Sequence, residues 1–289
     1  MTPATNGLRN DVPLSRRRFI AASAVTPLGA AVVQAETAPA AAAAGTLRVL
    51  SYNIHYGQGM DGRYDVPRIA DVITRLAPDL VALQECDVGV RRSGQVNEVV
   101  ELGRLTGMAA RFGPTQHYEG GLFGNAVLSR LPILDVRIDP LPYTEATADL
   151  VTYPRGAIAV TVALPDGAPL RFVSTHFQHN VADDRLAEAR AINALFAADG
   201  DATPTILAGD INATPESQPV AELLTRWRNV TEEPPQPTVP VATPTSRIDY
   251  IFVRPAERFE VLETRVIPEI MASDHRPVFA VLRLVATDR

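Results

Sequence analysis

Short apolar segments recur along most of the chain, and several are followed at once by a polar or ionisable side chain. Apolar runs of this length, bounded by turn residues, are typical of β-strands. The segments that fit this pattern are Leu47–Tyr52, Leu80–Gln84, Ala157–Leu164, Leu170–Thr175, Thr205–Gly209, Ile248–Val253 and Val278–Leu284. Asn53, Glu85, His176 and Asp210 stand directly after four of them. A turn explains one such residue, but four predict that several strand ends converge on one rim of the fold.

Amphipathic segments alternate with these strands and predict helices. The three predicted helices are Val66–Leu76, Val96–Thr106 and Asp184–Ala198. Gly107 follows the second helix, where glycine commonly ends a helix, and Asp183 offers an N-cap for the third. The proline-rich stretch 232–244 predicts a surface loop, because a strand pattern resumes after it.

The composition describes an ordinary globular protein and excludes several kinds of chemistry. The 289 residues suffice for one substantial core or two modest ones. There is no lysine, so neither Schiff-base nor P-loop lysine chemistry is available. The net charge of −6 disfavours tight wrapping of nucleic acid, although a bound cation can reverse the local field around carboxylates. Cys86 is the one cysteine, which excludes an intrachain disulfide and predicts a small core residue.

The first residues have the pattern of an export signal. The basic segment Ser15–Ile20 precedes the Ala-rich run Ala21–Ala35, and its paired arginines resemble the twin-arginine export signal of bacteria. A basic disordered tail is the alternative. We therefore expect residues 1–44 to be a signal peptide with a small-residue linker and 45–289 to be one folded domain. This predicts a partner in the twin-arginine machinery, a periplasmic or extracellular location and no stable membrane span.

Two polar motifs in the second half of the chain suggest a site. Asp210 and Asn212 are two residues apart, so a locally extended backbone would point both side chains the same way. An Asx-turn also explains this pair. Asp249 stands within an apolar strand, and an unpaired charge there costs several kcal/mol to bury. It therefore needs a partner, which is either a histidine or the neighbouring Arg247.

The segment Ser273–Pro277 offers both metal-ligand and acid–base chemistry. His275 can take a proton from water at neutral pH when an acidic group orients it. Glu85 and Asp274 are hard oxygen ligands that suit Mg²⁺. No Cys/His cluster with zinc spacing is present. Of the other histidines, His117 and His179 are expected to be ordinary core or surface residues.

Read in order, seven motifs between Thr46 and Leu284 resemble the endonuclease/exonuclease/phosphatase superfamily. This superfamily includes DNase-like nucleases, apurinic endonucleases, neutral sphingomyelinases and inositol polyphosphate 5-phosphatases. Each motif alone is weak, and their shared order carries the resemblance. The matching segments are Ser51–His55, Leu83–Glu85, Gly124–Arg130, Ser174–His176, Gly209–Asn212, Arg247–Ile251 and Ser273–Val278.

The resemblance implies an α+β fold, a four-layer α/β/β/α sandwich of two mixed sheets with helices on the outer faces. It implies that residues 45–289 form the catalytic domain. Glu85 resembles the principal metal carboxylate, with Asn53 and Asp274 near the metal or its waters. The catalytic set it implies is His275 oriented by Asp249, Asp210 and Asn212 positioning the water and phosphate, and His176 on the phosphoryl oxygens. The implied cofactor is Mg²⁺, with Mn²⁺ or another divalent cation as the alternative.

Three further residues are candidate substrate contacts. Asn125 and His55 lie in matching motifs, and a turn or strand role explains Asn125 equally well. Arg155 stands between Pro154 and Gly156 and could bind phosphate through its planar fork, with surface solvation as the alternative.

The predicted activity is metal-dependent hydrolysis of a phosphate ester by in-line attack of water. A phosphodiester in a small molecule or lipid headgroup is favoured over nucleic acid, and we expect a monomer. A scavenging nuclease and a non-catalytic binding module of the same fold are the alternatives. A serine hydrolase is disfavoured, because no Gly-x-Ser-x-Gly motif follows a strand.

Overall fold

The computed structural model describes residues 45–231 and 234–285. The predicted signal peptide and linker, residues 1–44, lie outside the described residues. Within the described residues, no helix is both long and apolar enough to cross a membrane.

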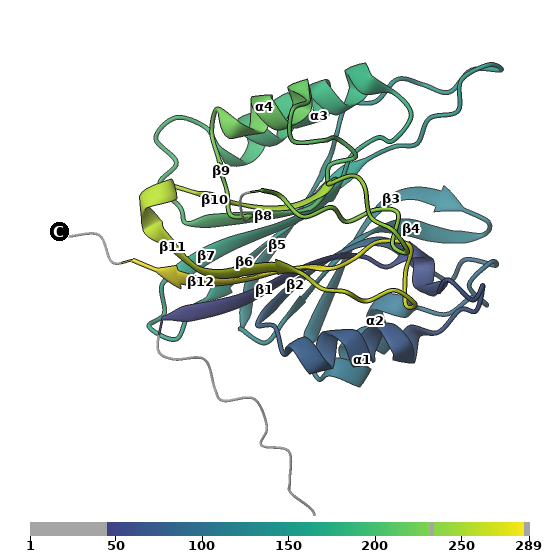
Figure 1. Ribbon diagram of the computed structural model, residues 1–289, viewed down its shortest axis with the longest axis horizontal. Helices are drawn as coiled ribbons and strands as arrows, with labels where there is room; N and C mark the ends of the chain where they lie inside the picture. Colours follow the sequence, from purple (N-terminus) through teal and green to yellow (C-terminus); the bar gives the residue numbers. More distant parts are fainter. Residues whose placement is uncertain (1–44, 232–233, 286–289) are drawn as a thin grey trace, which may run out of the picture. The chain divides into compact units, whose positions relative to one another are not determined.

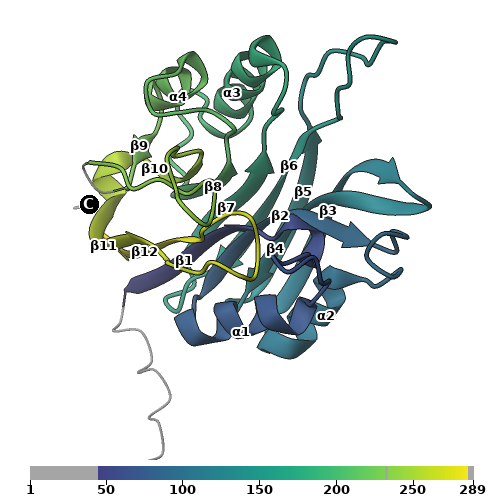
Figure 2. The same ribbon diagram turned by 45° about the vertical axis from the view of Figure 1, so that its right-hand side comes forward.

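The first of two six-stranded sheets has the strand order β11-β12-β1-β2-β4-β3. Strands β1 and β2 are parallel, and the other neighbours are antiparallel, so the sheet is mixed. Its strands are β1 (Thr46–Asn53), β2 (Leu80–Val88), β3 (Ala109–Tyr118), β4 (Gly121–Ser129), β11 (Phe259–Val266) and β12 (Val278–Leu284). Helices α1 (Val66–Leu76) and α2 (Glu98–Thr106) cover its outer face (Figures 1 and 2).

The second sheet has the order β5-β6-β7-β8-β10-β9, with β7 and β8 parallel. Its strands are β5 (Ile133–Pro140), β6 (Gly156–Ala163), β7 (Pro169–His176), β8 (Thr205–Asp210), β9 (Arg228–Asn229) and β10 (Asp249–Arg254). Helices α3 (Ala182–Phe196) and α4 (Gln218–Leu224) cover the opposite outer face (Figure 1). Two short 3-10 helices, η1 (His55–Gly57) and η2 (Ala256–Arg258), complete the elements.

Alternating side chains divide each sheet between two hydrophobic cores. Along β1, Leu47 and Val49 enter the central core between the sheets, whereas Leu50 and Tyr52 pack toward α1 and α2. A third core lies between the second sheet and helices α3 and α4. The four layers and two mixed sheets confirm the predicted sandwich. Cys86 and Trp227 are buried in the two outer cores.

Several predicted elements need correction. The third helix begins at Ala182 with Val181 as its N-cap, so Asp183 is not the cap. The second helix begins at Glu98, because the Asn97 side chain accepts from Val100 N and caps it. Strands β3, β4, β5, β9 and β11 were not predicted.

Candidate active site

Several strands end or begin at one edge of the sandwich. Strands β1, β7 and β8 finish at this edge, β2 passes it at Glu85 before ending at Val88, and β10, antiparallel to β8, starts there. Strand β12, antiparallel to β1, also starts there. The predicted convergence of strand ends is therefore confirmed. It brings together residues from both sheets: Asn53, Glu85, His176, Asp210, Asp249 and His275.

Polar side chains join the two sheets directly beneath this edge. Asn53 Nδ2 on β1 donates to Asp210 Oδ2 on β8 at 3.1 Å. Gln84 Nε2 on β2 donates to Ser174 Oγ on β7 at 3.2 Å, and Ser174 Oγ donates to Leu83 O at 3.0 Å. These buried hydrogen bonds fix the register of one sheet against the other, and so fix the groups above them.

The partner of the buried Asp249 carboxylate is a histidine. His275 Nδ1 lies 3.1 and 3.0 Å from the two Asp249 oxygens. Arg247, the alternative partner, directs Nε to the backbone carbonyl of Asp249 instead. The other ring nitrogen, His275 Nε2, lies 3.7 Å from Asp210 Oδ2. One imidazole therefore stands between two buried carboxylates.

The charges of this trio shift its protonation. Burial alone would lower the pKa of His275, but the carboxylates of Asp249 and Asp210 outweigh that effect and raise the pKa to about 10. Burial, reinforced by the charge of Asp249, raises the pKa of Asp210 above that of an ordinary aspartate. His275 therefore keeps its proton at neutral pH, and Asp210 is a stronger base than an exposed carboxylate.

Glu85 is turned into the site by an irregularity in β2. The register between β2 and β4 shifts between Leu83 and Cys86, and Glu85 has a φ of 57°. Bulges of this kind redirect a side chain, and a non-glycine residue in the left-handed region stores local strain. The strand continues to Val88, beyond the predicted end at Gln84. Asn53 Nδ2 holds the redirected carboxylate, donating to Glu85 Oε1 at 3.0 Å.

Arg155 fixes the orientation of two histidines. Its Nη1 lies 3.2 Å from His176 Nδ1, and its Nη2 lies 3.4 Å from His179 Nδ1. A guanidinium only donates, so His179 accepts at Nδ1 and carries its proton on Nε2, whereas His176 has a donor at each ring nitrogen, Arg155 at Nδ1 and Asn212 at Nε2. Burial, and then the charge of Arg155, holds the pKa of His176 well below its ordinary value and also lowers that of His179. His176 is therefore neutral, with its Nε2 3.5 Å from Asp210 Oδ2.

Asn212 does not lie on an extended backbone, which corrects the sequence-based expectation. Its φ is 50°, and its backbone N–H donates to Asp210 Oδ1 at 2.9 Å, so the pair forms an Asx-type turn. Asn212 Nδ2 donates to Phe177 O at 2.9 Å and lies 3.0 Å from His176 Nε2. The turn still directs both side chains to the same cavity.

Five predicted residues do not line the main cavity of the site. Asn53 and Asp249 contact residues that do, and the other three are Asn125, His55 and Asp274. Asn125 is buried and donates through Nδ2 to Gly156 O at 2.8 Å, a contact that joins β4 to the second sheet. His55 does not line the main cavity, and its Nδ1 lies 3.9 Å from Asp274 Oδ1. Asp274 lines a neighbouring cavity of about 380 Å³ that shares His275 with the first.

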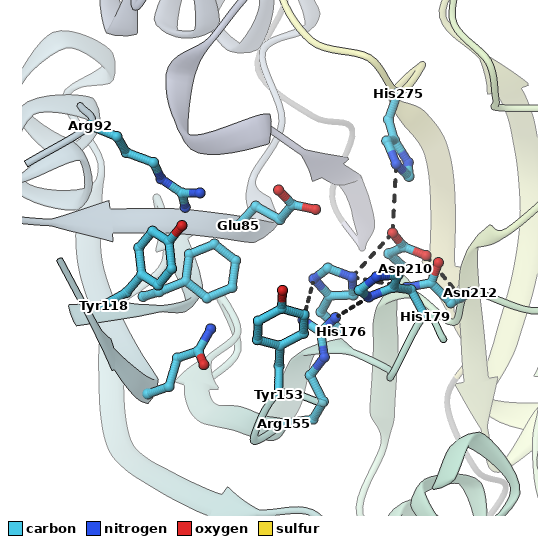
Figure 3. A pocket seen from close by; sticks show the side chains of 12 residues that line it. Glu85, Arg92, Tyr118, Tyr153, Arg155, His176, His179, Asp210, Asn212 and His275 are labelled. Carbon is cyan, nitrogen blue, oxygen red and sulfur yellow. Dashed lines mark hydrogen bonds and ion pairs between the residues drawn. The ribbon is translucent and has the colours of Figure 1, made fainter. Parts of the chain in front are cut away.

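A cavity of about 310 Å³ collects the remaining groups (Figure 3). The predicted residues that line it are Glu85, Arg155, His176, Asp210, Asn212 and His275. The residues that sequence reasoning missed are Arg92, Gln116, Tyr118, Phe123, Tyr153 and His179. His179 was expected to be an ordinary histidine. Its signal was present in the spacing, because it lies three residues after His176, the last residue of β7.

The donor set suits a hard divalent cation. Among the described residues, Asp210, Asp249 and His275 each bring a potential ligand atom within 4.8 Å of the others, and all three are buried. Glu85 adds a carboxylate on the same cavity. Asn53 presents its amide nitrogen to the carboxylates, while its Oδ1 accepts from His55 N at 3.0 Å. The residues therefore fit a metal held through carboxylate oxygens, which Mg²⁺ prefers.

Two mixed sheets packed face to face, with helices outside and one carboxylate–histidine cavity at the strand ends, define a sandwich-type hydrolase fold. The chain belongs to the Endonuclease/Exonuclease/phosphatase family, whose sequence profile matches residues 50–275. Members of this family are generally phosphoester hydrolases. A search of curated proteins found no match.

Solved structures share the fold. An endonuclease/exonuclease/phosphatase from Beutenbergia cavernae DSM 12333 is 27% identical with a TM-score of 0.70, covering 83% of this chain and 72% of that one. A mannosyl-6-phosphatase from Bacteroides thetaiotaomicron is 22% identical with a TM-score of 0.66, covering 83% and 100%. The human Nocturnin catalytic domain with bound sulfate is 19% identical with a TM-score of 0.63, covering 84% and 96%.

Proposed function

We propose that the protein is an exported, divalent-metal-dependent hydrolase of phosphate esters, acting on diesters by in-line attack of water. The observation that carries the proposal is the gathering of Glu85, Asp210, His275, His176 and Arg155 around one cavity. Such a set supplies the functions that phosphoester hydrolysis needs: a cation, a base and donors to the phosphoryl oxygens.

Glu85 is the proposed metal carboxylate, with Asn53 positioning it and Asp274 near the metal's waters. When bound, Mg²⁺ or Mn²⁺ would supply Lewis-acid neutralisation of the phosphoryl oxygens. The hydrogen bond from Asn53 to Glu85 supports this assignment, because residues that orient a ligand contribute to metal affinity.

Asp210 is the proposed base for the attacking water. Its raised pKa makes it a better proton acceptor than an ordinary aspartate, and it lies between His176 and His275. His275, held protonated by Asp249, would act as a cationic donor to the phosphate. This division of roles follows from the charges around each group.

Arg155, His176 and Asn212 are the proposed contacts to the phosphoryl oxygens. Arg155 is buried, and its fork stays charged. His176 is neutral, so it can contact an oxygen without adding charge. These donors lie in place before a substrate binds, which favours a transition state in which negative charge spreads over the oxygens.

The location and assembly remain proposals from the sequence. The twin-arginine pattern in residues 1–44 supports export to the periplasm or cell exterior through that machinery, and we propose a monomer. A fusion of residues 1–44 to a reporter protein, with and without Arg16 and Arg17, would test export. Retention of export without the two arginines would contradict the assignment.

Activity is tested with protein lacking residues 1–44 in Mg²⁺, Mn²⁺ or EDTA, against a chromogenic phosphodiester, sphingomyelin, phosphatidylinositol, RNA and plasmid DNA. We expect metal-dependent hydrolysis that EDTA abolishes, and full activity in EDTA would contradict the proposal. Glu85→Ala and His275→Ala should each lower turnover by about 10²-fold or more. Glu145→Ala and His117→Ala are matched controls, because both side chains are exposed and lie outside the cavity.

The same panel decides between a small-molecule phosphodiesterase and a scavenging nuclease. Cleavage of plasmid DNA at low enzyme concentration, in preference to the small diesters, would establish the nuclease. The acidic balance of the chain favours the small-molecule substrate, because little positive charge is available to offset a long phosphate backbone.

A further inference from the structure

The cavity has a second half that the proposed chemistry does not use. In Figure 3, His275, Asp210, Asn212 and His176 lie on one side, and Arg92 and Tyr118 lie on the other, with Glu85 and Tyr153 between them. Gln116 and Phe123 complete its lining. This half is rich in aromatic rings, whereas the half with the carboxylates and histidines is not.

Arg92 is fixed in place and its charge is compensated. Its Nε and Nη2 each donate at 2.9 Å to the fully buried carboxylate of Asp87. Its guanidinium carbon lies 3.5 Å from the ring centroid of Tyr56, 4.6 Å from that of Tyr118 and 5.3 Å from that of Phe123. Arg92 therefore serves as a rigid base for the rings, and this pairing leaves it poorly suited to bind a second phosphate.

The polar tips in this half are available to a ligand. The side chains of Gln116, Tyr118 and Tyr153 form no hydrogen bond with any described residue. The Tyr153 ring is nevertheless held in position, because it stacks on His179 with centroids 5.7 Å apart and planes 19° apart. One amide and two hydroxyls thus border a space walled by ordered aromatic faces.

We infer that this half of the cavity is a subsite for an uncharged ring bearing hydrogen-bonding groups, a nucleobase or a sugar ring, carried by the phosphate ester. This inference rests on the proposed hydrolase function and names its substrate class. Aromatic faces stack on flat rings, and the amide and hydroxyls pair with polar substituents of the ring. An acyl chain would leave those polar groups without partners when it excluded water, which is costly.

Binding without turnover tests the subsite directly. Calorimetry in EDTA compares thymidine 5′-phosphate with deoxyribose 5-phosphate, and glucose 6-phosphate with sorbitol 6-phosphate. Each pair shares its phosphate. Thymidine 5′-phosphate differs from its partner by the nucleobase and glucose 6-phosphate by the pyranose ring, and these two are the ring-bearing members. We expect the ring-bearing member of one pair to bind about tenfold more tightly, the gain typical of one stacked ring. The pair that shows the gain identifies a nucleobase or a sugar as the source.

Variants at Tyr118 separate stacking from hydrogen bonding. Tyr118→Ala should abolish the ring-dependent gain, and Tyr118→Phe should retain most of it. Tyr143→Ala is the matched control, because Tyr143 is exposed and lies outside the cavity. Circular dichroism establishes whether each variant is folded. If Tyr118→Ala does not fold, the test continues with Tyr118→Phe. Equal binding within both pairs by the wild-type protein, or a gain that survives Tyr118→Ala, would overturn the subsite.

Hydrolysis of the same compounds and their methyl diesters in Mg²⁺ separates this inference from the proposed function. Rings that bind tightly but are never hydrolysed would remove the hydrolase and leave the ring subsite standing. Hydrolysis of both members of each pair at equal kcat/KM would support the hydrolase and remove the ring subsite. Hydrolysis that favours the ring-bearing member, with the preference lost in Tyr118→Ala, supports both.

Discussion

Asp249 Oδ2 lies 3.0 Å from His275 Nδ1, although the two residues belong to different sheets. Asp249 begins β10 in the second sheet, and His275 precedes β12 in the first. Ser273 Oγ donates to Asn53 O at 2.7 Å and anchors the segment that carries His275. The histidine is therefore oriented from both sides of the sandwich.

Asp249→Asn should move the alkaline limit of activity to lower pH. The Asp249 and Asp210 carboxylates raise the pKa of His275 to about 10 against the effect of burial, so the protonated donor persists up to that pH. Removal of one carboxylate lowers this pKa, so the alkaline decline of activity should shift to lower pH by about one unit or more. The profile of kcat/KM from pH 5 to 11 measures the shift. An unchanged alkaline limb would show that His275 does not act as the cation.

Asn53→Ala should weaken the binding of a divalent cation. The Asn53 amide donates to Glu85 at 3.0 Å and to Asp210 at 3.1 Å, and its loss leaves two carboxylates without a shared donor. We expect Mn²⁺ affinity and kcat/KM to fall by about 10-fold to 100-fold. Calorimetric titration with Mn²⁺ measures the affinity. Asn229→Ala on β9 is the control, and equal Mn²⁺ affinity in the two variants would contradict this role.

Arg155→Met should release the tautomer of His179. In the native protein a guanidinium nitrogen lies 3.4 Å from His179 Nδ1, which keeps the proton of the ring on Nε2. Long-range ¹H–¹⁵N NMR distinguishes the tautomers. We expect the Nε2–H form of His179 in the native protein and a mixture in the variant. A protonated Nδ1 on His179 in the native protein would refute the assignment.

Two buried glutamates should make the protein less stable as the pH rises. Glu98 Oε2 accepts from Asp87 N at 2.8 Å, and Glu188 Oε2 accepts from Gln178 N at 2.8 Å. In each, the other oxygen is buried without a hydrogen-bond partner among the described residues. Burial raises the pKa of both carboxyls to about 8. Each helix, α2 and α3, thus uses one buried acid to hold the backbone near the end of a neighbouring strand, Asp87 within β2 and Gln178 after β7.

The sign follows from proton counting. Between pH 4.5 and 8 the folded state holds protons on these acids that the unfolded state has lost, so stability falls with rising pH. The loss is on the order of a few kcal/mol for each acid. Glu98→Gln and Glu188→Gln should each flatten this slope in urea unfolding at pH 5, 6.5 and 8. Glu257→Gln, an exposed site, should not, and equal slopes in all three variants would contradict the prediction.

The strand ends could be predicted because burial and charge conflict there. Asp249 within an apolar strand required a partner, and His275 is that partner. Strand β5 offers no such conflict, because it is an edge strand with mostly exposed side chains, and its strict apolar/polar alternation from Leu134 to Asp139 was not used. Asp183 does not cap the third helix because that helix begins at Ala182, which places Asp183 in its first turn. The adjacent Asp184 accepts from Thr144 N and Oγ1 and holds a distant loop.

The aromatic half of the cavity could not be read from the sequence. Its rings belong to Tyr118 on β3, Phe123 on β4 and Tyr153 in the loop between β5 and β6 of the other sheet. No local pattern links them, and only the folded topology brings them to one cavity. The left-handed backbone at Glu85 is equally invisible, because the bulge depends on pairing with β4.

Because the site is built from residues of both sheets, the proposed catalysis depends on how the two sheets pack against each other. One sheet carries Asn53, Glu85 and the segment with His275, and the other sheet carries His176 and Asp210. A slip of one sheet by a fraction of a residue would separate them while leaving every strand intact. Turnover should therefore vanish at lower urea concentration than the far-ultraviolet dichroism of the strands, and Ser174→Ala, which removes an inter-sheet bond, should widen that interval.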